Sequence, residues 1–320
     1  SAASDVYKRQ PDYIMAKLGL NLLSGLFIGS SFWGQGQNQT KIALQNRMFA
    51  IFLALCVSTP IAQQLQPVFI QIRDIYEARE RPSKMYRWPV FVLSAAVVEI
   101  PWSFFCGTIL WIPWYFMVHF DHDGKRAAYS WGMYMLFQLY YVSFAQTVAI
   151  LSANALLASM LYSTLFSFVV VYCGVMQPPG QMPHFWSSWM FYLSPFTWFV
   201  EGMFGDAVKG KPVRCAPMEM NRIYPPSGQS CDSYLGNFTS SLNQPAKPGT
   251  GYYETAPDGS CLYCTYREAE DYINNIWMHS KNEYRDIGLV IVYIIFNFFL
   301  MFGIYAIVRT NFLSVSYTHL

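Results

Sequence analysis

The residues whose chemistry is most distinctive are four cysteines that share one hydrophilic stretch, at about 209–285. They are Cys215, Cys231, Cys261 and Cys264, out of seven cysteines in the chain. If this stretch lies outside the cell, an even number of thiols predicts two disulfides. Cys261 and Cys264 also have the spacing of half a zinc site. The stretch offers no second pair at that spacing and only His279 as a further ligand, so we expect disulfides and no metal site.

A charged insert separates the second long apolar run from the third. Residues 74–89 mix acidic and basic side chains, in a chain with only 12% charged residues. Alternating charge is typical of a solvated helix held by ion pairs along its own surface. It also suits a surface that docks a soluble partner, and the residues alone leave both interpretations open. Either way the pattern predicts a short cytosolic helix or elbow that ends near Pro82.

Two carboxylates lie in otherwise apolar surroundings. Glu99 precedes Pro101 within a long apolar run, and Glu201 follows an aromatic-rich segment. A carboxylate at such a depth is costly to bury, so it should face protein, water or a cation. Glu99 therefore predicts a structural ion pair, with a proton relay as the alternative. Pro101 predicts a kink, or a join between two helical pieces.

No pattern of catalytic residues is present. The chain contains no G-x-x-x-x-G-K-[ST] and no H-E-x-x-H, and its five histidines suggest no Ser-His-Asp arrangement. We therefore expect no catalytic residue in this chain.

The second and fifth apolar runs combine large apolar side chains with hydroxyls, amides and prolines. The residues concerned are Phe49, Phe52, Val57, Thr59, Pro60, Gln63, Gln64, Gln66, Pro67, Phe166, Ser167, Val170 and Met176. Amides in a membrane helix face other helices or water rather than acyl chains. Such a wall suits hydrophobic ligands, because apolar contact is non-directional and Met adapts its shape. Ordinary helix packing is the alternative.

The elements that must position these residues are membrane helices. The composition is 53% hydrophobic and 18% aromatic, and the net charge of +2 gives no indication of nucleic-acid binding. A bilayer requires about 20 apolar residues per helix. Runs of that length lie at about 14–32, 49–69, 90–118, 128–151, 156–176 and 287–308. The predicted fold class is an all-α polytopic membrane protein with six transmembrane helices.

Basic residues in the short connections predict the orientation of these helices. One side would hold Lys17, Arg73, Arg79, Arg81, Lys84, Arg87 and Arg309, and the other side Lys41, Arg47, Lys125 and Arg126. The first side should be the cytosol, which places 209–285 outside. Asn237-Phe238-Thr239 in that stretch is an N-glycosylation sequon, which agrees with this orientation.

Residues 177–198 are rich in both prolines and aromatics. Prolines forbid a continuous helix, whereas aromatics suit the membrane interface. This combination predicts a re-entrant hairpin, so 177–286 would comprise that hairpin and a large extracellular loop.

Both ends of the chain are expected to be foreign. Residues 5–10 can be encoded by a DNA string whose reverse complement encodes Val-Ser-Tyr-Thr-His and the start of a Leu codon, which matches 315–320. A sequencing adapter at both ends would explain this. We therefore expect 1–10 and 315–320 to be adapter-derived and 11–314 to be the transmembrane domain.

Several ordered motifs resemble one family. They are Arg79-Glu80-Arg81-Pro82-Ser83-Lys84-Met85-Tyr86, Val98-Glu99-Ile100-Pro101-Trp102, Pro183-His184-Phe185-Trp186 and Tyr192-Leu193-Ser194-Pro195-Phe196-Thr197. Together they resemble the fungal pleiotropic-drug-resistance (PDR) group of ABCG-type ABC transporters, specifically the C-terminal transmembrane half. The resemblance extends from Pro11 to Phe312.

The resemblance implies an ATP-driven exporter that moves hydrophobic drugs, xenobiotics or lipids across the plasma membrane by alternating access. The six helices would form the ABCG-type (ABC type-2) transmembrane domain. This chain would hold no cofactor, because ATP and Mg²⁺ would bind nucleotide-binding domains that it lacks. Those domains and the N-terminal transmembrane half, on the same polypeptide, are the expected partners, with hydrophobic small molecules and the lipid bilayer. A passive channel or receptor-like multi-pass protein without ATP coupling is the alternative.

The resemblance also assigns roles to residues. It implies that 74–89 is a coupling segment that contacts a nucleotide-binding domain through Glu77, Arg79, Glu80, Arg81 and Lys84. The implied substrate contacts are Phe52, Cys56, Val57, Thr59, Pro60, Ser163, Phe166, Ser167 and Val170. Gly174, Val175 and Met176 resemble an apolar exit plug. The implied disulfides are Cys215–Cys264 and Cys231–Cys261, and Asn237 is the expected glycosylation site.

Overall fold

Helices form most of the structure, a computed structural model that describes residues 11–226, 228–242 and 251–311. The longer helices are α2 (Pro11–Ser31), α3 (Lys41–Cys56), α4 (Ser58–Ile75), α5 (Trp88–Val118), α6 (Gly124–Leu151), α7 (Ala155–Val171), α10 (Pro195–Val208), α11 (Cys231–Leu242) and α13 (Glu283–Ile304). The short helices are α8 (His184–Ser187), α9 (Met190–Leu193) and α12 (Ala269–Asn275), with the 3-10 turns η2 (Pro179–Gln181) and η3 (Ser280–Asn282). Two π-helical turns, η1 (Tyr76–Glu80) and η4 (Tyr305–Asn311), follow α4 and α13. The strands are β1 (Asn221–Ile223), β2 (Tyr252–Thr255) and β3 (Cys261–Cys264).

Five helical stretches of the described chain are long and apolar enough to cross a membrane. They are Asp12–Ser31, Lys41–Glu80, Trp88–Val118, Gly124–Leu151 and Ser280–Thr310. The helix in the remaining predicted span, α7, has only 17 residues and ends at Val171 rather than at 176. The backbone leaves the helix before Gly174, which has a φ of +87°. Five of the six predicted spans are therefore found as helices long enough to cross a membrane, whereas the fifth along the chain, α7, falls short of that length.

The second membrane stretch is divided at Val57 into α3 and α4. Pro60 lacks an N–H group, and its ring crowds the carbonyl of the residue four positions earlier, which is Cys56. The hydrogen-bond ladder is therefore interrupted here. Thr40 begins α3 by accepting a hydrogen bond from the Ala43 N–H at 3.2 Å, a normal N-cap.

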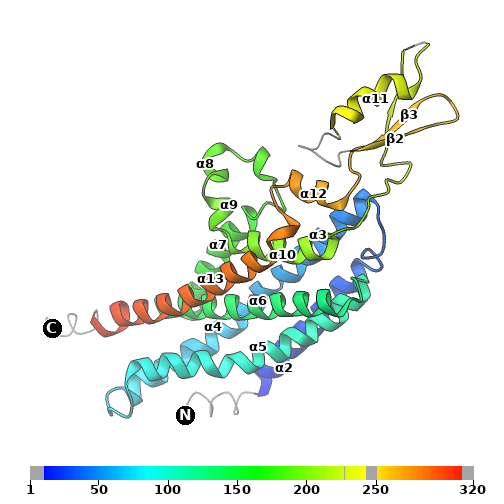
Figure 1. Cartoon of the computed structure of the whole chain (residues 1–320). Coiled ribbons are helices and arrows are strands. Elements are labelled where there is room, and N and C mark those ends of the chain that lie inside the picture. Colours follow the sequence, from blue (N-terminus) through cyan, green and yellow to red (C-terminus); the bar gives the residue numbers. More distant parts are fainter. Residues whose placement is uncertain (1–10, 227, 243–250, 312–320) are drawn as a thin grey trace.

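α6 lies at the centre of the bundle. It packs against α4, α5, α7, α10 and α13, while α2 packs along α5. Large buried aromatic side chains on α6, including Tyr134, Phe137 and Tyr141, form much of the shared core. The turn that follows η1 and the small sheet lie at opposite ends of the bundle (Figure 1).

A buried ion pair holds α2 against α5. Lys17 Nζ lies 2.7 Å from Glu99 Oε2, and the two side chains are 2% and 0% exposed. The Tyr13 hydroxyl donates to the other Glu99 oxygen at 3.1 Å. The prediction of a structural ion pair for Glu99 is thus confirmed. α5 continues through Pro101 as one helix, so no join between separate pieces is found there.

Three of the basic residues used to predict the orientation, Lys17, Arg47 and Arg73, are instead buried in helices. Lys17 is not a free charge at the membrane surface, because Glu99 neutralises it inside the bundle. Arg47, assigned to an outer connection, lies in α3 and donates to the carbonyls of Gln35 and Asn38. The predicted orientation therefore depends on the other lysines and arginines in the connections between helices.

Both expected disulfides form in the stretch 209–285. Cys215 pairs with Cys264 and Cys231 with Cys261, with Cα–Cα distances of 5.9 and 5.6 Å. The antiparallel sheet has the order β1-β3-β2. Cys264 at the end of β3 packs in the main core, whereas Cys261 at its start packs with Leu235 of α11 in a separate cluster. The pairing implied by the resemblance is confirmed. Asn237 belongs to α11, but its side chain lies outside the described part of the structure.

Candidate functional site

The predicted second and fifth spans lie side by side, as a shared binding wall requires. α4 packs against α7, and Gln63 Nε2 donates to the Ser163 hydroxyl at 3.1 Å. Among the predicted contact residues, Phe52 and Phe166 are buried and Pro60 and Ser167 are exposed. The partly buried ones are Cys56, Val57, Thr59, Ser163 and Val170. The two phenylalanines thus lie beneath the predicted binding surface of the two helices, and the other residues are accessible on it.

One exposed face of α4 is polar. Pro60, Gln63, Pro67, Gln71 and Asp74 recur every three or four residues along it, and all five are exposed. The exposed residues in the middle of α2 are instead apolar, as Leu22, Leu23, Leu26 and Phe27 show. Amide groups lose hydrogen bonds in hydrocarbon, which costs free energy. The α4 face therefore suits water or another protein surface, whereas the α2 face suits lipid.

Two hollows open along this wall. One has a volume of about 350 Å³ and is lined by Thr164, Ser167, Phe168, Val171 and Tyr172. The other has a volume of about 560 Å³ and is lined by Pro67, Ile70, Gln71, Asp74, Ile75, Ala78 and Arg79. Hollows of this size are large enough for small organic molecules.

Thr164, Phe168 and Gln71 line these hollows but were not among the predicted contacts. Thr164 lies three residues before Ser167, and Gln71 lies four after Pro67. Helical spacing around the polar residues of the two runs would have identified them, because residues three and four apart share a face.

The segment predicted as an exit plug forms a tight apolar turn after α7. Gly174 has a φ of +87°, and a Cβ atom there would lie 2.8 Å from Phe191 Cε2. Glycine alone fits such a position without strain. Val175 is buried, whereas Met176 is 63% exposed.

The charged insert continues α4 and then turns back. η1 covers Tyr76–Glu80, and Lys84 takes a left-handed φ of 53° in the following turn. Of the predicted coupling residues, Arg79 and Lys84 are exposed, while Glu77, Glu80 and Arg81 are partly buried. In the described chain, no ion pair joins two residues of 74–89, since Asp74 pairs with Arg73 and Glu77 with Arg309. The described ion pairs of the insert thus connect it to residues outside it, while hydrogen bonds such as that from the Tyr86 hydroxyl to Glu80 hold it internally.

Arg309, beyond α13, connects this insert to the end of α6. Its side chain lies 3.7 Å from Glu77 Oε2 and donates to the carbonyls of Ile150 at 3.2 Å and Ser152 at 2.7 Å. The Tyr305 hydroxyl donates to Glu77 at 3.3 Å. Arg81 Nη1 donates to the Arg309 carbonyl at 2.8 Å.

Arg73 of α4 binds the same end of α6. Its side chain is 1% exposed, and Nη1 donates to the carbonyls of Ala149 and Ser152, each at 2.7 Å. Nη2 donates to the Ala153 carbonyl at 3.3 Å. The last carbonyls of a helix lack partners within it, so this guanidinium satisfies groups that would otherwise be orphaned. Arg73 thereby fixes the C-terminal end of α4 to the turn between α6 and α7.

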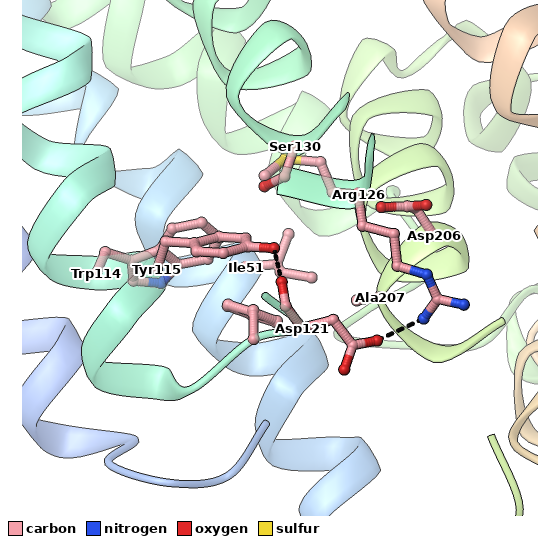
Figure 2. Close-up of a pocket in the computed structure, with 10 residues that line it drawn as sticks. Ile51, Trp114, Tyr115, Asp121, Arg126, Ser130, Asp206 and Ala207 are labelled. Carbon is pink, nitrogen blue, oxygen red and sulfur yellow. Dashed lines mark hydrogen bonds and ion pairs between the residues drawn. The ribbon is translucent and has the colours of Figure 1, made fainter. Parts of the chain in front are cut away.

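Charged groups at the opposite end of the bundle gather around Asp121 (Figure 2). Its carboxylate pairs with Arg126 at 2.5 Å and with Lys211 at 3.0 Å, and its carbonyl accepts from the Tyr115 hydroxyl at 2.6 Å. Burial alone would raise the pKa of Asp121, but hydrogen bonds and charge from Lys211 and Arg126 lower it below its usual value. The cavity here is about 10 Å³, room for about one water molecule. This cluster joins the α5–α6 turn to the segment after α10 and is too small for a ligand.

Glu201 in α10 has the partner that its depth required. It lies 2.8 Å from Arg285 Nη2 and accepts hydrogen bonds from the His279 backbone at 3.0 Å and from Asn282 Nδ2 at 3.1 Å. No group of three or more His, Cys, Asp or Glu residues in the described chain is placed to hold a metal ion.

Comparison with known proteins identifies the family of this chain independently of the structure. The family model described as "ABC-2 type transporter" matches residues 3–205. The chain is 38% identical over 307 residues to the Brefeldin A resistance protein of Schizosaccharomyces pombe, covering 95% of this chain and 20% of that protein. It is 34% identical over 310 residues to ABC multidrug transporter AFR2 of Cryptococcus neoformans, covering 94% and 20%. It is 35% identical over 299 residues to the pleiotropic ABC efflux transporter of multiple drugs of Saccharomyces cerevisiae, covering 91% and 19%. The chain thus spans about a fifth of the length of these curated relatives.

Proposed function

Because the chain belongs to the ABC-2 type transporter family, we propose that it is the C-terminal transmembrane half of an ATP-driven exporter. Its cargo would be hydrophobic drugs, xenobiotics or lipids, carried out through the plasma membrane. The names of the relatives, which refer to drug resistance, multidrug transport and drug efflux, support this proposal. Their greater length supports placing two nucleotide-binding domains, which bind ATP and Mg²⁺, and a first transmembrane half on the same polypeptide. The full-length protein would then be an ABC-type ATPase, although this chain supplies no catalytic residue.

In this proposal α7 is also a membrane span, the fifth of six along the chain. Its 17 residues extend about 26 Å at 1.5 Å per residue, close to the hydrocarbon core of about 30 Å. Residues 172–176 and the short helices α8 and α9 would complete the crossing as a re-entrant hairpin. The exposed aromatic side chains of Phe185, Trp189 and Tyr192 suit the membrane interface, which supports this placement.

The observation that carries the proposal is the exposed polar face of α4 beside α7. Such a face is unfavourable against lipid, so it should face a water-filled pathway shared with the first transmembrane half. Substrates would contact the α7 hollow around Ser167 and the surface residues around the α3–α4 break, including Cys56, Val57, Thr59 and Pro60. A surface of apolar side chains with a few polar groups fits a site that accepts many hydrophobic compounds, because apolar contact is non-directional.

The proposed mechanism is alternating access driven by ATP. Closure of the nucleotide-binding domains would move η1 through Glu77, Arg79, Glu80, Arg81 and Lys84. Because buried arginines tie this region to the end of α6, the motion would reach the α6–α7 turn and then the wall. The Gly174–Met176 turn would open as the exit plug. ATP is needed because a substrate shifts an equilibrium only by its differential affinity for the two states.

Substitution of Ser167 is the direct test of the wall. We expect Ser167→Val in the full-length protein to change the apparent affinity for individual fluorescent dyes by up to about tenfold, while ATPase activity persists. Ser31→Val is a matched control, because both hydroxyls are exposed and donate to a carbonyl four residues earlier, at 2.7 and 2.8 Å. If the apparent affinities for many dyes were unchanged, Ser167 would not be a substrate contact. Dye efflux that continues without ATP would instead favour a passive channel.

A further inference from the structure

A cationic hollow lies where the charged insert meets α5. It has a volume of about 650 Å³ and is lined by Tyr76, Arg81, Lys84, Met85, Tyr86, Arg87, Trp88 and Pro89. The left-handed backbone of Lys84 turns the chain between Arg81 and Arg87, so that all three cationic residues line the same space. The hollow lies between the end of the membrane stretch Lys41–Glu80 and the start of Trp88–Val118. It therefore lies at a membrane boundary.

The acidic groups of the insert already have partners, and in the described chain only Glu80 is bonded to a residue that lines the hollow. Asp74 pairs with Arg73, and Glu77 pairs with Arg309. Glu80 accepts a hydrogen bond from the Tyr86 hydroxyl. Lys84 and Arg87 are exposed, and no described carboxylate lies within 4.0 Å of either one. The hollow therefore has net positive charge and favours an anionic ligand.

An apolar stripe leads away from this hollow along α5. Val90, Leu93 and Val97 are 54%, 54% and 51% exposed. Their spacing of three and four residues places them on one face of the helix. Trp88 at the beginning of the stripe is held by stacking on Tyr305, with ring centroids 5.5 Å apart. Tryptophan prefers the headgroup level of a membrane, and aliphatic side chains prefer the acyl region below it.

We propose that this hollow binds the phosphate headgroup of an anionic phospholipid, whose acyl chain lies along Val90, Leu93 and Val97. Lys84 and Arg87 would hold the phosphate by charge-assisted hydrogen bonds. The proposed orientation places the hollow in the cytosolic leaflet, where anionic lipids are enriched. A lipid fits better than a soluble anion, because the apolar stripe begins where the cations end. In this proposal Arg81 and Lys84 are assigned to the lipid rather than to the nucleotide-binding domain, which the exposed Arg79, outside this hollow, would contact.

Native mass spectrometry of the full-length protein tests this assignment without depending on transport. Detergent-purified protein would be titrated with phosphatidylserine or phosphatidylcholine of identical acyl chains. We expect selective retention of phosphatidylserine. Each cation near a membrane surface contributes about fivefold in affinity. Arg87→Gln should therefore weaken phosphatidylserine binding about fivefold, and Lys84→Gln with Arg87→Gln about 30-fold.

Two control variants and one competing compound test whether the cations of the hollow and the acyl chain both contribute to phosphatidylserine binding. Lys125→Gln with Lys281→Gln removes two exposed cations outside the hollow and should leave binding unchanged. Lys84→Arg with Arg87→Lys preserves charge and should retain the lipid. Glycerophosphoserine, which lacks acyl chains, should compete poorly.

Several results would overturn the assignment. They are equal retention of the two lipids, phosphatidylserine binding that survives the double Gln substitution, and competition by glycerophosphoserine as strong as that of the lipid. A zero-length crosslink from Lys84 to a nucleotide-binding domain, with no lipid preference, would assign the hollow to a protein contact.

Discussion

Lys17→Met in the full-length protein is expected to lower the free energy of unfolding by about 3–5 kcal/mol. The substitution leaves the Glu99 carboxylate buried between α2 and α5, where its remaining partner among the described residues is the Tyr13 hydroxyl. An unpaired buried charge costs far more than the lost contact, because neither water nor lipid can solvate it there. Thermal unfolding of the detergent-solubilised protein, followed by fluorescence-detected size-exclusion chromatography, measures the effect.

A double variant that removes both charges separates the effect of the unpaired charge on stability from the effect of lost packing. Lys17→Met combined with Glu99→Leu removes both charges, so most of the lost stability should return. Lys125→Met, at an exposed position, should change little. If the double variant is as unstable as Lys17→Met alone, compensation of charge is not what the pair contributes.

Arg73→Met is expected to lower the amount of dye exported per ATP hydrolysed by at least about tenfold, and to lower the free energy of unfolding by about 3 kcal/mol. The loss in stability follows because carbonyls at the end of α6 lose a charged donor, each such bond being worth about 1.5–3 kcal/mol. The loss in coupling follows from the proposed function, since α4 would no longer hold the α6–α7 turn. Simultaneous dye efflux and ATPase assays in proteoliposomes give the ratio.

Arg73→Lys provides the conservative comparison. Lysine keeps the charge but lacks the planar fork that reaches several carbonyls at once, so it should restore coupling only in part. Arg214→Met, an exposed arginine in the outer stretch, serves as the control for loss of an arginine. Full coupling in Arg73→Met would show that the proposed transmission does not pass through this residue.

The sequence predicted the membrane helices well because hydropathy depends on local composition. It also indicated that Glu99 requires a partner, since any carboxylate in an apolar run does. It could not identify Lys17, which lies 82 positions away and looked like a charge at a helix end. Such a pairing depends on how α2 packs against α5, which no local pattern contains.

The end of α7 illustrates a different limit. The run 156–176 is apolar throughout, so hydropathy gives no sign that the helix stops at Val171. The stop depends on the backbone angle at Gly174 and on the nearby ring of Phe191. The polar face of α4, in contrast, is visible in the spacing of its glutamines and prolines. Composition grouped the second and fifth runs, but the contact between α4 and α7 depends on how the helices pack.

The position of β3 has a consequence for how the protein is made. Each disulfide joins an earlier cysteine, Cys215 or Cys231, to one in β3, and β3 is synthesised after both. Neither native bond can therefore close until the ribosome has synthesised the segment just before α13. In the proposed orientation, the thiols of Cys215 and Cys231 would until then remain without their native partners in a translocated loop, where an oxidoreductase could engage them. The oxidation state of Cys215 would thus report, during biosynthesis, whether the chain has been threaded as far as its last membrane helix.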